Sequence, residues 1–380
     1  MHKRIPIFYL ITSTNAGGTE KALYELITRI DRQRFSICVC SVKKPGVFAR
    51  RLAEAADCFL SLDMPEEGSM RAAICLPQAV RILVRELRHR QPTIVHTFLF
   101  RANIVGRIAA RYAGIPYVIC SLRVLEEHAW AKHVIDRFTA GMVDTYLAVS
   151  EAVRRFSVNR LRIPPEKIIT VPNGIDCTAI PFAEKKQMSA APVLLVAARF
   201  ERQKAHPIFI DAVKLLVRQG IIVQAQLFGE GPDEKYLRQR IHAEGLASHI
   251  HLMGVVPDII PYLQQADLCV LPSLWEGQPN ILLEAIAVGC PVVATRIPGV
   301  DEIVVDGETG ILCKPGSAQS LADGLAYMIN HPREAARMAA AARQQVERFF
   351  SIHETVRATV AVYEQLLGSP AAHNTKHSGQ

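Results

Sequence analysis

Residues 268–289 read LCVLPSLWEGQPNILLEAIAVG, which is a short apolar run followed by a polar loop and then by a helical pattern. We expect a buried strand at 268–271 and a helix that runs to Gly289. Pro279 suits the first turn of this helix, where the missing N–H of a proline has no intrahelical acceptor. A strand, a loop and a helix in this order form half of a βαβ unit.

The same alternation fills both halves of the chain, which favours mainly parallel sheets and an α/β fold. We expect two doubly wound, Rossmann-like domains, at residues 1–178 and 179–355. The C-terminal region is a helical pattern with a break near Phe350. We therefore expect a terminal helix at 356–367, followed by a disordered tail at 368–380.

The expected strands are short apolar runs separated by longer helical patterns. They lie at 5–11, 36–42, 93–96, 117–121 and 145–149 in the first half, and at 193–198, 224–228, 249–253, 268–271 and 291–294 in the second. Helical periodicity marks 20–30, 78–90 and 103–112. The polar stretch 181–192 separates the two series and is the expected linker.

Composition limits the classes of protein that remain. The chain has 380 residues, of which 49% are hydrophobic and 21% charged, so it can bury the cores of two ordinary domains. Its net charge of +8 attracts anions, whether nucleic acid, acidic headgroups or phosphorylated substrates. The nine cysteines are scattered, which indicates a reducing, cytoplasmic compartment. No stretch approaches the ~20 apolar residues that span a bilayer, so we expect any membrane contact to be peripheral.

Two glutamates flank the start of the expected helix, Glu276 in the loop and Glu284 within the helix. Free backbone amides near Asn280 and Ile281, together with the helix dipole, predict an anion site at the carboxyl edge of a sheet. A nucleotide sugar needs amides for its diphosphate and carboxylates for its ribose and sugar hydroxyls, because a carboxylate accepts two hydrogen bonds at once. The alternative, that both glutamates are solvated surface charges, stays open at this point.

The spacing of these glutamates resembles the paired-glutamate motif of the retaining GT-B glycosyltransferases in glycosyltransferase family four, the glycosyl transferases group 1. The resemblance covers nearly the whole chain. It implies a GT-B fold whose two domains face a central cleft, with the first domain for the acceptor and the second for the donor. It also implies that Glu276 contacts the transferred sugar, that Glu284 contacts the ribose, and that the terminal helix packs back on the first domain.

Other segments fall where that family places its site residues. Arg199 and Lys204 resemble the pair that grips the diphosphate, although Ala205 stands where the family usually has glycine. Two fixed cations stabilise the negative charge of the departing phosphate without a metal. The resemblance also implies donor-binding roles for backbone near the loops and helix start, at Gly17, Gly18, Gly229, Pro279, Asn280, Ile281 and Gly299.

Arg123 follows an expected strand at a point where many relatives carry a histidine near the reacting carbon. An arginine stays protonated and is a poor general base. We therefore hypothesise that the leaving phosphate takes the acceptor proton, and that Arg123 holds the phosphate or the acceptor. We expect His96, at the end of its strand, to be packed rather than catalytic.

The function implied is a retaining, metal-independent hexosyltransferase that moves a sugar from a UDP- or GDP-linked donor to a hydroxyl. The expected acceptor is a growing or lipid-linked glycan in cell-surface polysaccharide or lipopolysaccharide biosynthesis. No cofactor is expected, since the nucleotide sugar is a co-substrate, and no nucleic-acid partner is expected. Two alternatives stay open, a non-catalytic GT-B scaffold in a polysaccharide assembly and a nucleotide-sugar epimerase.

Arginines gather in the first half, and Arg81, Arg85 and Arg88 have spacings that put them on one helix face. A basic helix face predicts peripheral contact with the inner face of the cytoplasmic membrane, where it would bring the enzyme to a lipid-linked acceptor. The alternative is an ordinary solvated face. The expected location is therefore cytoplasmic, with peripheral contact at the cytoplasmic face of the membrane.

Overall fold

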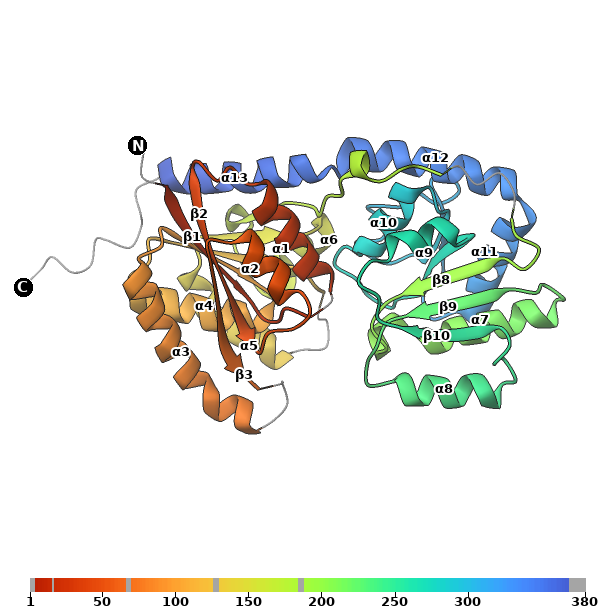
Figure 1. Cartoon of the computed structure of the whole chain (residues 1–380), viewed down its shortest axis with the longest axis horizontal. Helices are drawn as coiled ribbons and strands as arrows, with labels where there is room; N and C mark the ends of the chain where they lie inside the picture. Colours follow the sequence, from red (N-terminus) through yellow and green to blue (C-terminus); the bar gives the residue numbers. More distant parts are fainter. Residues whose placement is uncertain (1–3, 16, 66–69, 126–129, 184–187, 369–380) are drawn as a thin grey trace, which may run out of the picture. The chain divides into compact units, whose positions relative to one another are not determined.

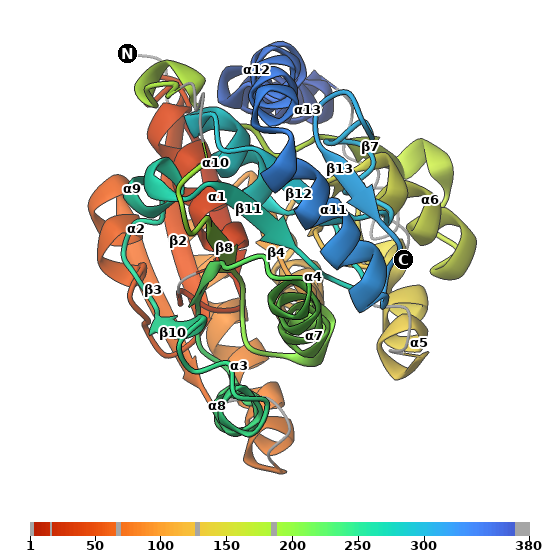
Figure 2. The ribbon, with the colours of Figure 1, turned by 90° about the vertical axis from the view of Figure 1, so that its right-hand side faces the viewer.

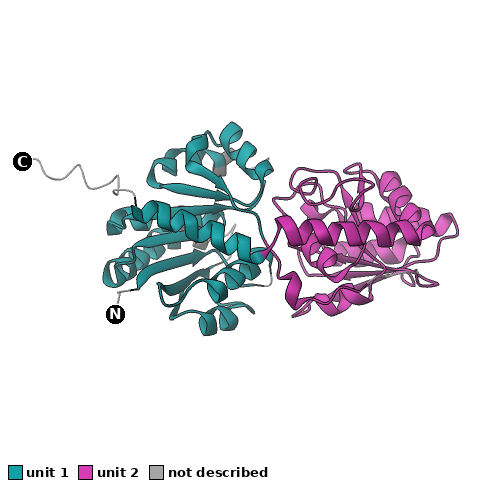
Figure 3. Ribbon diagram, turned by 90° about the horizontal axis from the view of Figure 1, so that it is seen from above, with its two compact units in different colours: residues 1–173, 352–380 teal, residues 174–351 magenta. Residues whose placement is uncertain are grey.

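The computed structural model describes residues 4–368 with the exception of 16, 66–69, 126–129 and 184–187. The chain divides into two compact units, which Figure 3 shows in different colours. Unit 1 comprises residues 1–173 and 352–380, and unit 2 comprises residues 174–351. The divisions fall a few residues before the boundaries expected at 178 and 355. Apart from Gly368, the expected disordered tail lies outside the described residues.

Unit 1 is a seven-stranded parallel sheet with the strand order β3-β2-β1-β4-β5-β6-β7. The strand order reverses between β1 and β4, which makes this a doubly wound sheet. Its strands are β1 (Ile5–Ile11), β2 (Phe35–Lys43), β3 (Cys58–Met64), β4 (Ile94–Phe98), β5 (Tyr117–Leu122), β6 (Thr145–Ala148) and β7 (Ile168–Thr170). Its helices are α1 (Gly18–Arg29), α2 (Ala49–Ala55), α3 (Met70–Arg90), α4 (Phe100–Ala113), α5 (Trp130–Thr139), α6 (Glu151–Arg160) and α13 (Ile352–Gly368).

Both faces of this sheet are covered, which explains why its central strands read as continuous apolar runs. Alternate residues of β1 point to opposite faces. Phe8 and Leu10 pack with residues of α3, α4 and α6, whereas Tyr9 and Ile11 pack with residues of α1 and α13. Figure 1 shows α13, at the C-terminal end of the chain, running beside α1.

Unit 2 is a six-stranded parallel sheet with the order β10-β9-β8-β11-β12-β13, reversing between β8 and β11. Its strands are β8 (Val193–Ala197), β9 (Gln224–Phe228), β10 (Ile250–Gly254), β11 (Leu268–Leu271), β12 (Val292–Thr295) and β13 (Ile311–Cys313). Its helices are α7 (His206–Arg218), α8 (Glu234–Ala243), α9 (Ile260–Gln265), α10 (Asn280–Val288), α11 (Ala318–Asn330) and α12 (Pro332–Phe349). One apolar cluster joins α7, α8 and α11 to the sheet, and another joins α9, α10 and α12 to its other face. Figure 2 shows α7 and α11 side by side on the first face.

These two doubly wound sheets confirm the α/β, two-domain fold predicted from the sequence. The strands that were not predicted, β3, β7 and β13, all lie at the edges of their sheets. The predicted linker at 181–192 is wrong, because this stretch belongs to unit 2. The Ala183 N–H donates to the carbonyl of Val288 at 3.0 Å, so the stretch is tied to the end of α10.

Arg343 on α12 ties three segments of unit 2 together. Its guanidinium donates to the carbonyl oxygens of Cys177, Ile180 and Ala287, and it also pairs with Glu347 at 2.6 Å. Only 11% of the Arg343 side chain is exposed. Because charge-assisted hydrogen bonds to carbonyls that water cannot reach are the strong ones, this side chain is a main connection between α12 and the rest of unit 2.

We predict that Arg343→Met lowers the free energy of unfolding of unit 2 by about 2–4 kcal/mol, since it leaves three carbonyls without their donor. Arg337→Met is the matched control on the same helix, because the Arg337 side chain is 53% exposed and its ion pair with Glu334 lies on the surface. The control should cost less than about 1 kcal/mol. Urea unfolding followed by circular dichroism measures both, and equal losses would contradict this role.

Candidate functional site

A buried ion pair joins the two loops that leave β8 and β11 in unit 2. Lys204 Nζ lies 2.5 Å from Glu276 Oε1, and the side chains are only 18% and 7% exposed. Ser273 Oγ donates to the same carboxylate oxygen at 2.7 Å. Breaking such a pair leaves an uncompensated buried charge, which is strongly destabilising unless another group takes its place.

Backbone and amide bonds hold these two loops against each other. Lys204 lies in a short 3-10 turn, Arg202–Lys204, after β8. Next to it, Gln203 Nε2 donates to the carbonyl of Trp275 at 2.7 Å, and the Leu274 N–H donates back to the carbonyl of Gln203 at 2.8 Å. Strands β8 and β11 are neighbours where the strand order reverses, so both loops leave the carboxyl edge of the sheet at its switch point, the usual place for a ligand.

The loop at Lys204 keeps its turn although the expected glycine is absent. Ala205 adopts a left-handed conformation with φ of +48°, a strain of about 1–2 kcal/mol for a residue with a Cβ. Helix α7 then begins at His206. Burial, and next the charge of Lys204, lower the pKa of His206 to about 4, so this imidazole is neutral beside the lysine.

Two glycines of the predicted site lie so close to the backbone of a neighbouring loop that a side chain would not fit. Gly299 has φ of +86°, and a Cβ there would lie 2.2 Å from the carbonyl oxygen of Gly277, next to Glu276. Gly229 has φ of +143°, and a Cβ there would lie 2.1 Å from the carbonyl oxygen of Ala198. Neither position admits a side chain unless a loop moves.

Helix α10 begins one residue later than expected, at Asn280, and Pro279 is its N-cap. The Leu282 N–H donates to the carbonyl of Pro279 at 3.2 Å, while the Ile281 N–H belongs to the first turn, which lacks intrahelical acceptors. Glu284 on this helix is 8% exposed and Glu276 is 6% exposed. The alternative that both glutamates are solvated surface charges is therefore wrong.

Arg199 is not part of the cluster around Lys204. Its side chain is 68% exposed and approaches Glu201 at 3.6 Å, and within the described residues this is its one ion pair. The sequence prediction grouped Arg199 with Lys204, but the structure joins only Lys204 to Glu276. A long, exposed and weakly held cation can change its rotamer to reach a ligand at low cost.

The glycine loop of unit 1 accommodates a buried carboxylate that sequence reasoning did not assign to the site. Gly17 is the N-cap of α1, which begins at Gly18, and a Cβ on Gly17 would lie 2.5 Å from Glu20 Oε2. Glu20 is 5% exposed and accepts a hydrogen bond of 2.6 Å from Ser13. The signal in the sequence was an acidic residue in the first helical turn directly after two glycines.

Arg123 lies half-buried just beyond β5 in unit 1. Its guanidinium donates to Asn173 Oδ1 and lies 6.0 Å from the centre of the Phe98 ring. Burial lowers the pKa of Arg123 to about 10, against the opposing effect of Glu20. Arg123 is therefore still a cation at neutral pH and cannot serve as a base. Asn173, its hydrogen-bond partner, is 5% exposed.

His96 is packed, as expected. It is 1% exposed, and its two ring nitrogens bond Tyr363 and Ser121. Burial, and then the charge of Arg123, lower the pKa of His96 to about 3. No three His, Cys, Asp or Glu side chains gather as a metal site within the part of the chain that the structure describes. The same part contains no helix that is long and apolar enough to cross a membrane.

Comparison with known proteins gives one consistent result over both units. Residues 16–179 match the family described as Glycosyltransferase Family 4, and residues 181–345 match Glycosyl transferases group 1. The amylovoran biosynthesis glycosyltransferase AmsK of Erwinia amylovora is 31% identical over 378 residues, which are 94% of this chain and 85% of that protein.

Two further similarities extend over most of the chain. A UDP-Gal:alpha-D-GlcNAc-diphosphoundecaprenol alpha-1,3-galactosyltransferase of Escherichia coli is 26% identical over 344 residues, which are 85% of this chain and 88% of that protein. The crystal structure of HepE from Anabaena with UDP and glucose aligns with a TM-score of 0.83 at 21% identity, covering 95% of this chain and all of HepE. At that identity the structural match shows the fold alone.

We predict that Gly299→Ala costs about 3 kcal/mol or more of unfolding free energy, because the new methyl meets the Gly277 carbonyl and φ is strained. Gly307→Ala is the matched control, since Gly307 has φ of +75° but open space around its Cβ position. Strain alone should cost the control about 1–2 kcal/mol. Chemical denaturation separates the two, and a Gly299→Ala protein no less stable than the control would contradict the close approach.

Proposed function

Because this chain belongs to the group 1 glycosyltransferases of glycosyltransferase family 4, we propose that it transfers a sugar from a nucleoside diphosphate to a hydroxyl of a growing or lipid-linked glycan, with retention at the anomeric carbon. The product would enter a cell-surface polysaccharide or a lipopolysaccharide. The observation that carries the proposal is the buried Lys204–Glu276 pair, a cation and a carboxylate held together at the carboxyl edge of the unit 2 sheet.

The pair suits a nucleotide sugar because the donor presents a partner to each member. Lys204 can exchange Glu276 for a diphosphate oxygen, and Glu276 is then free to accept hydrogen bonds from sugar hydroxyls. The first-turn amide of Ile281 adds a phosphate donor, and Glu284 on the same helix would accept from the ribose diol. Arg199 would swing from Glu201 to the diphosphate.

In the proposed reaction the bond between the anomeric carbon and the phosphate oxygen breaks, and the acceptor oxygen bonds to the same face of that carbon. The acceptor proton passes to the departing phosphate, since Arg123 stays protonated and cannot take it. The two cations of unit 2 stabilise the charge that develops on the leaving group. On this account the transfer is independent of a metal and of any cofactor.

The donor and acceptor classes are supported by the relatives. The Escherichia coli relative is named for UDP-Gal as donor and for a sugar on diphosphoundecaprenol as acceptor. AmsK is named for the biosynthesis of amylovoran. We therefore favour a UDP-sugar over a GDP-sugar and a lipid-linked glycan over a free one.

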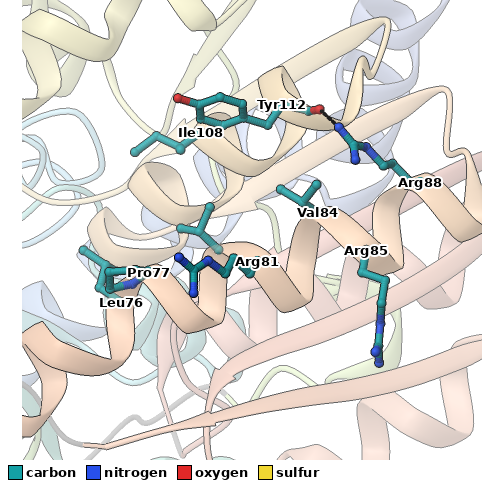
Figure 4. Close-up of a pocket in the computed structure, with 9 residues that line it drawn as sticks. Leu76, Pro77, Arg81, Val84, Arg85, Arg88, Ile108 and Tyr112 are labelled. Carbon is teal, nitrogen blue, oxygen red and sulfur yellow. Dashed lines mark hydrogen bonds between the residues drawn. The ribbon is translucent and has the colours of Figure 1, made fainter.

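We further propose that unit 1 contacts an anionic membrane through a groove between α3 and α4. The groove has a volume of about 730 Å³, and its lining includes apolar side chains such as Val80, Val84 and Ile108. Figure 4 shows Arg81 and Arg85 extending from α3 and Arg88 bonded to the backbone of Tyr112. An apolar floor beside several arginines complements an acyl chain with a phosphate headgroup.

The transferase proposal predicts that UDP release from a UDP-sugar rises when lipid extract containing the acceptor is added. Lys204→Ala and Glu276→Ala should each lower kcat/KM about 100-fold or more, because each removes one member of a buried pair at the phosphate and sugar. Lys214→Ala, which opens the surface pair with Glu244, is the control and should keep wild-type activity. Anomeric proton NMR of the product should show retention.

If Glu276→Ala were as active as the Lys214→Ala control, the assignment of the donor site would be wrong. Conversion of the donor sugar without transfer to any acceptor would overturn the transferase itself.

The membrane proposal predicts that the protein sediments with phosphatidylglycerol vesicles at low salt and is released as salt rises, because the contact is electrostatic. Arg81→Ser with Arg85→Ser should lower the vesicle binding constant about 30-fold, at about 1 kcal/mol for each arginine. Arg50→Ser on α2 removes one exposed arginine elsewhere in unit 1 and should bind as the wild type does. Equal binding to neutral phosphatidylcholine vesicles would argue against the groove as an anionic lipid site.

A further inference from the structure

Four buried polar side chains form a continuous hydrogen-bonded chain beneath α13 in unit 1. The Tyr9 and Tyr363 hydroxyls lie 3.1 Å apart, the Tyr363 hydroxyl is 2.7 Å from His96 Nδ1, and His96 Nε2 is 2.9 Å from Ser121 Oγ. None of the four is more than 3% exposed. The chain therefore runs from the core to the end of β5, two residues before Arg123.

The number of hydrogens in this chain exceeds the number of bonds. Three hydroxyls and a neutral imidazole supply four hydrogens, because burial and the charge of Arg123 keep the pKa of His96 near 3. The chain contains only three hydrogen bonds. One hydrogen must therefore point out of the chain, from Tyr9, from Tyr363 or from Ser121.

The surroundings of the three hydroxyls decide which of them keeps the extra hydrogen. Tyr9 and Tyr363 are fully buried in an apolar cluster, and within the described residues neither hydroxyl has a hydrogen-bond partner outside this chain. A donor stranded there would lose its hydrogen bond to water without compensation. Ser121 lies at the carboxyl end of β5, at the sheet edge where ligands of such folds bind.

The chain is therefore polarised in one direction. Tyr9 donates to Tyr363, Tyr363 donates to His96 Nδ1, and His96 Nε2–H donates to Ser121 Oγ. The hydroxyl hydrogen of Ser121 is left to point away from the chain. Arg123 follows Ser121 by two residues, and its charge contributes to lowering the pKa of His96, the hydrogen-bond partner of Ser121, so the guanidinium lies near this end of the chain.

The hydroxyl donor of Ser121 and the guanidinium of Arg123 lie near each other, and together they match one class of ligand. Arg123 forms no ion pair within 4 Å among the residues that the structure describes, so its charge is not neutralised by a contacting carboxylate. Two neighbouring donors, one of them cationic, match the oxygens of a phosphate group. Both the leaving diphosphate of the donor and the phosphate of a lipid-linked acceptor carry such oxygens.

We infer that Ser121 is a substrate-binding residue that donates its hydroxyl hydrogen to a phosphate oxygen held by Arg123, in an orientation fixed by the Tyr9–Tyr363–His96 chain. This inference rests on the proposed function and adds to it a residue of unit 1 and the chemistry that it recognises. It also means that α13, the last helix of the protein, helps to orient the site residues, because Tyr363 orients His96.

The direction of the chain is tested without substrate, by ¹⁵N NMR of the histidine-labelled full-length protein. The signals of His96 are identified by their loss in His96→Gln. We expect a hydrogen on Nε2 and none on Nδ1 at neutral pH. A hydrogen on Nδ1 would mean that Ser121 donates to His96, and the inference would be wrong.

The ligand is tested with Ser121→Ala, Ser121→Thr and, as the matched control, Ser41→Ala. Ser41 is a fully buried strand serine of unit 1 whose hydroxyl bonds a backbone carbonyl, so its loss reports only stability. Ser121→Ala should weaken binding of the phosphate-bearing substrate about 10–100-fold. Ser121→Thr keeps the hydroxyl and should recover most of the lost affinity.

The two sources of phosphate give different results in this experiment. A weaker Kd for UDP in titration calorimetry assigns the contact to the donor, whereas an unchanged Kd with a raised KM for the lipid-linked acceptor assigns it to the acceptor. Unchanged values for both would overturn the inference. A wild-type protein that transfers no sugar would contradict the proposed function, while the tautomer of His96 would still decide whether Ser121 is a donor.

Discussion

The buried contact between Lys204 and Glu276 is the constraint on which the organisation of unit 2 depends. Two ions that are almost out of water are stable only while each holds the other or a substitute of the opposite kind. The contact requires β8 and β11 to be neighbours, and it requires the loops after them to touch, as the bonds of Gln203 show. The close approach of Gly299 supports the loop that carries Glu276. In the function that we propose, this site exchanges ion-pair partners instead of creating new ones.

In unit 1, Arg123 keeps its charge without a contacting ion pair among the described residues. It lies half-buried next to an amide and an aromatic ring, with a more distant carboxylate, Glu20, and remains a cation. Beside it the polar chain that ends at Ser121 has one more hydrogen than it has hydrogen bonds. Both features leave donor capacity at the carboxyl end of β5. The phosphate-bearing substrates that we propose would accept hydrogen bonds from these donors.

The sequence was sufficient for the parts of the fold and site that depend on local pattern. Glu276, Glu284 and Lys204 were singled out because they sit beside strand ends and a helix start, and the structure brings Lys204 and Glu276 into contact. The central strands were predicted because both their faces are buried. The edge strands β7 and β13 have three residues each, too few for a pattern. The chain through Tyr363 joins residues more than 250 positions apart, so no local signal predicted it. Arg199 was grouped with Lys204 because of their spacing in the sequence. In the structure the Arg199 side chain is 68% exposed, whereas that of Lys204 is 18% exposed.

The most direct test of the proposed donor site is a crystal structure of the protein with a non-hydrolysable UDP-sugar. We expect the contact between Lys204 and Glu276 to open, with Lys204 Nζ on a diphosphate oxygen and the Glu276 carboxylate on sugar hydroxyls. The fold around the two loops should not change. A complex in which the nucleotide binds elsewhere while the 2.5 Å contact persists would contradict the account.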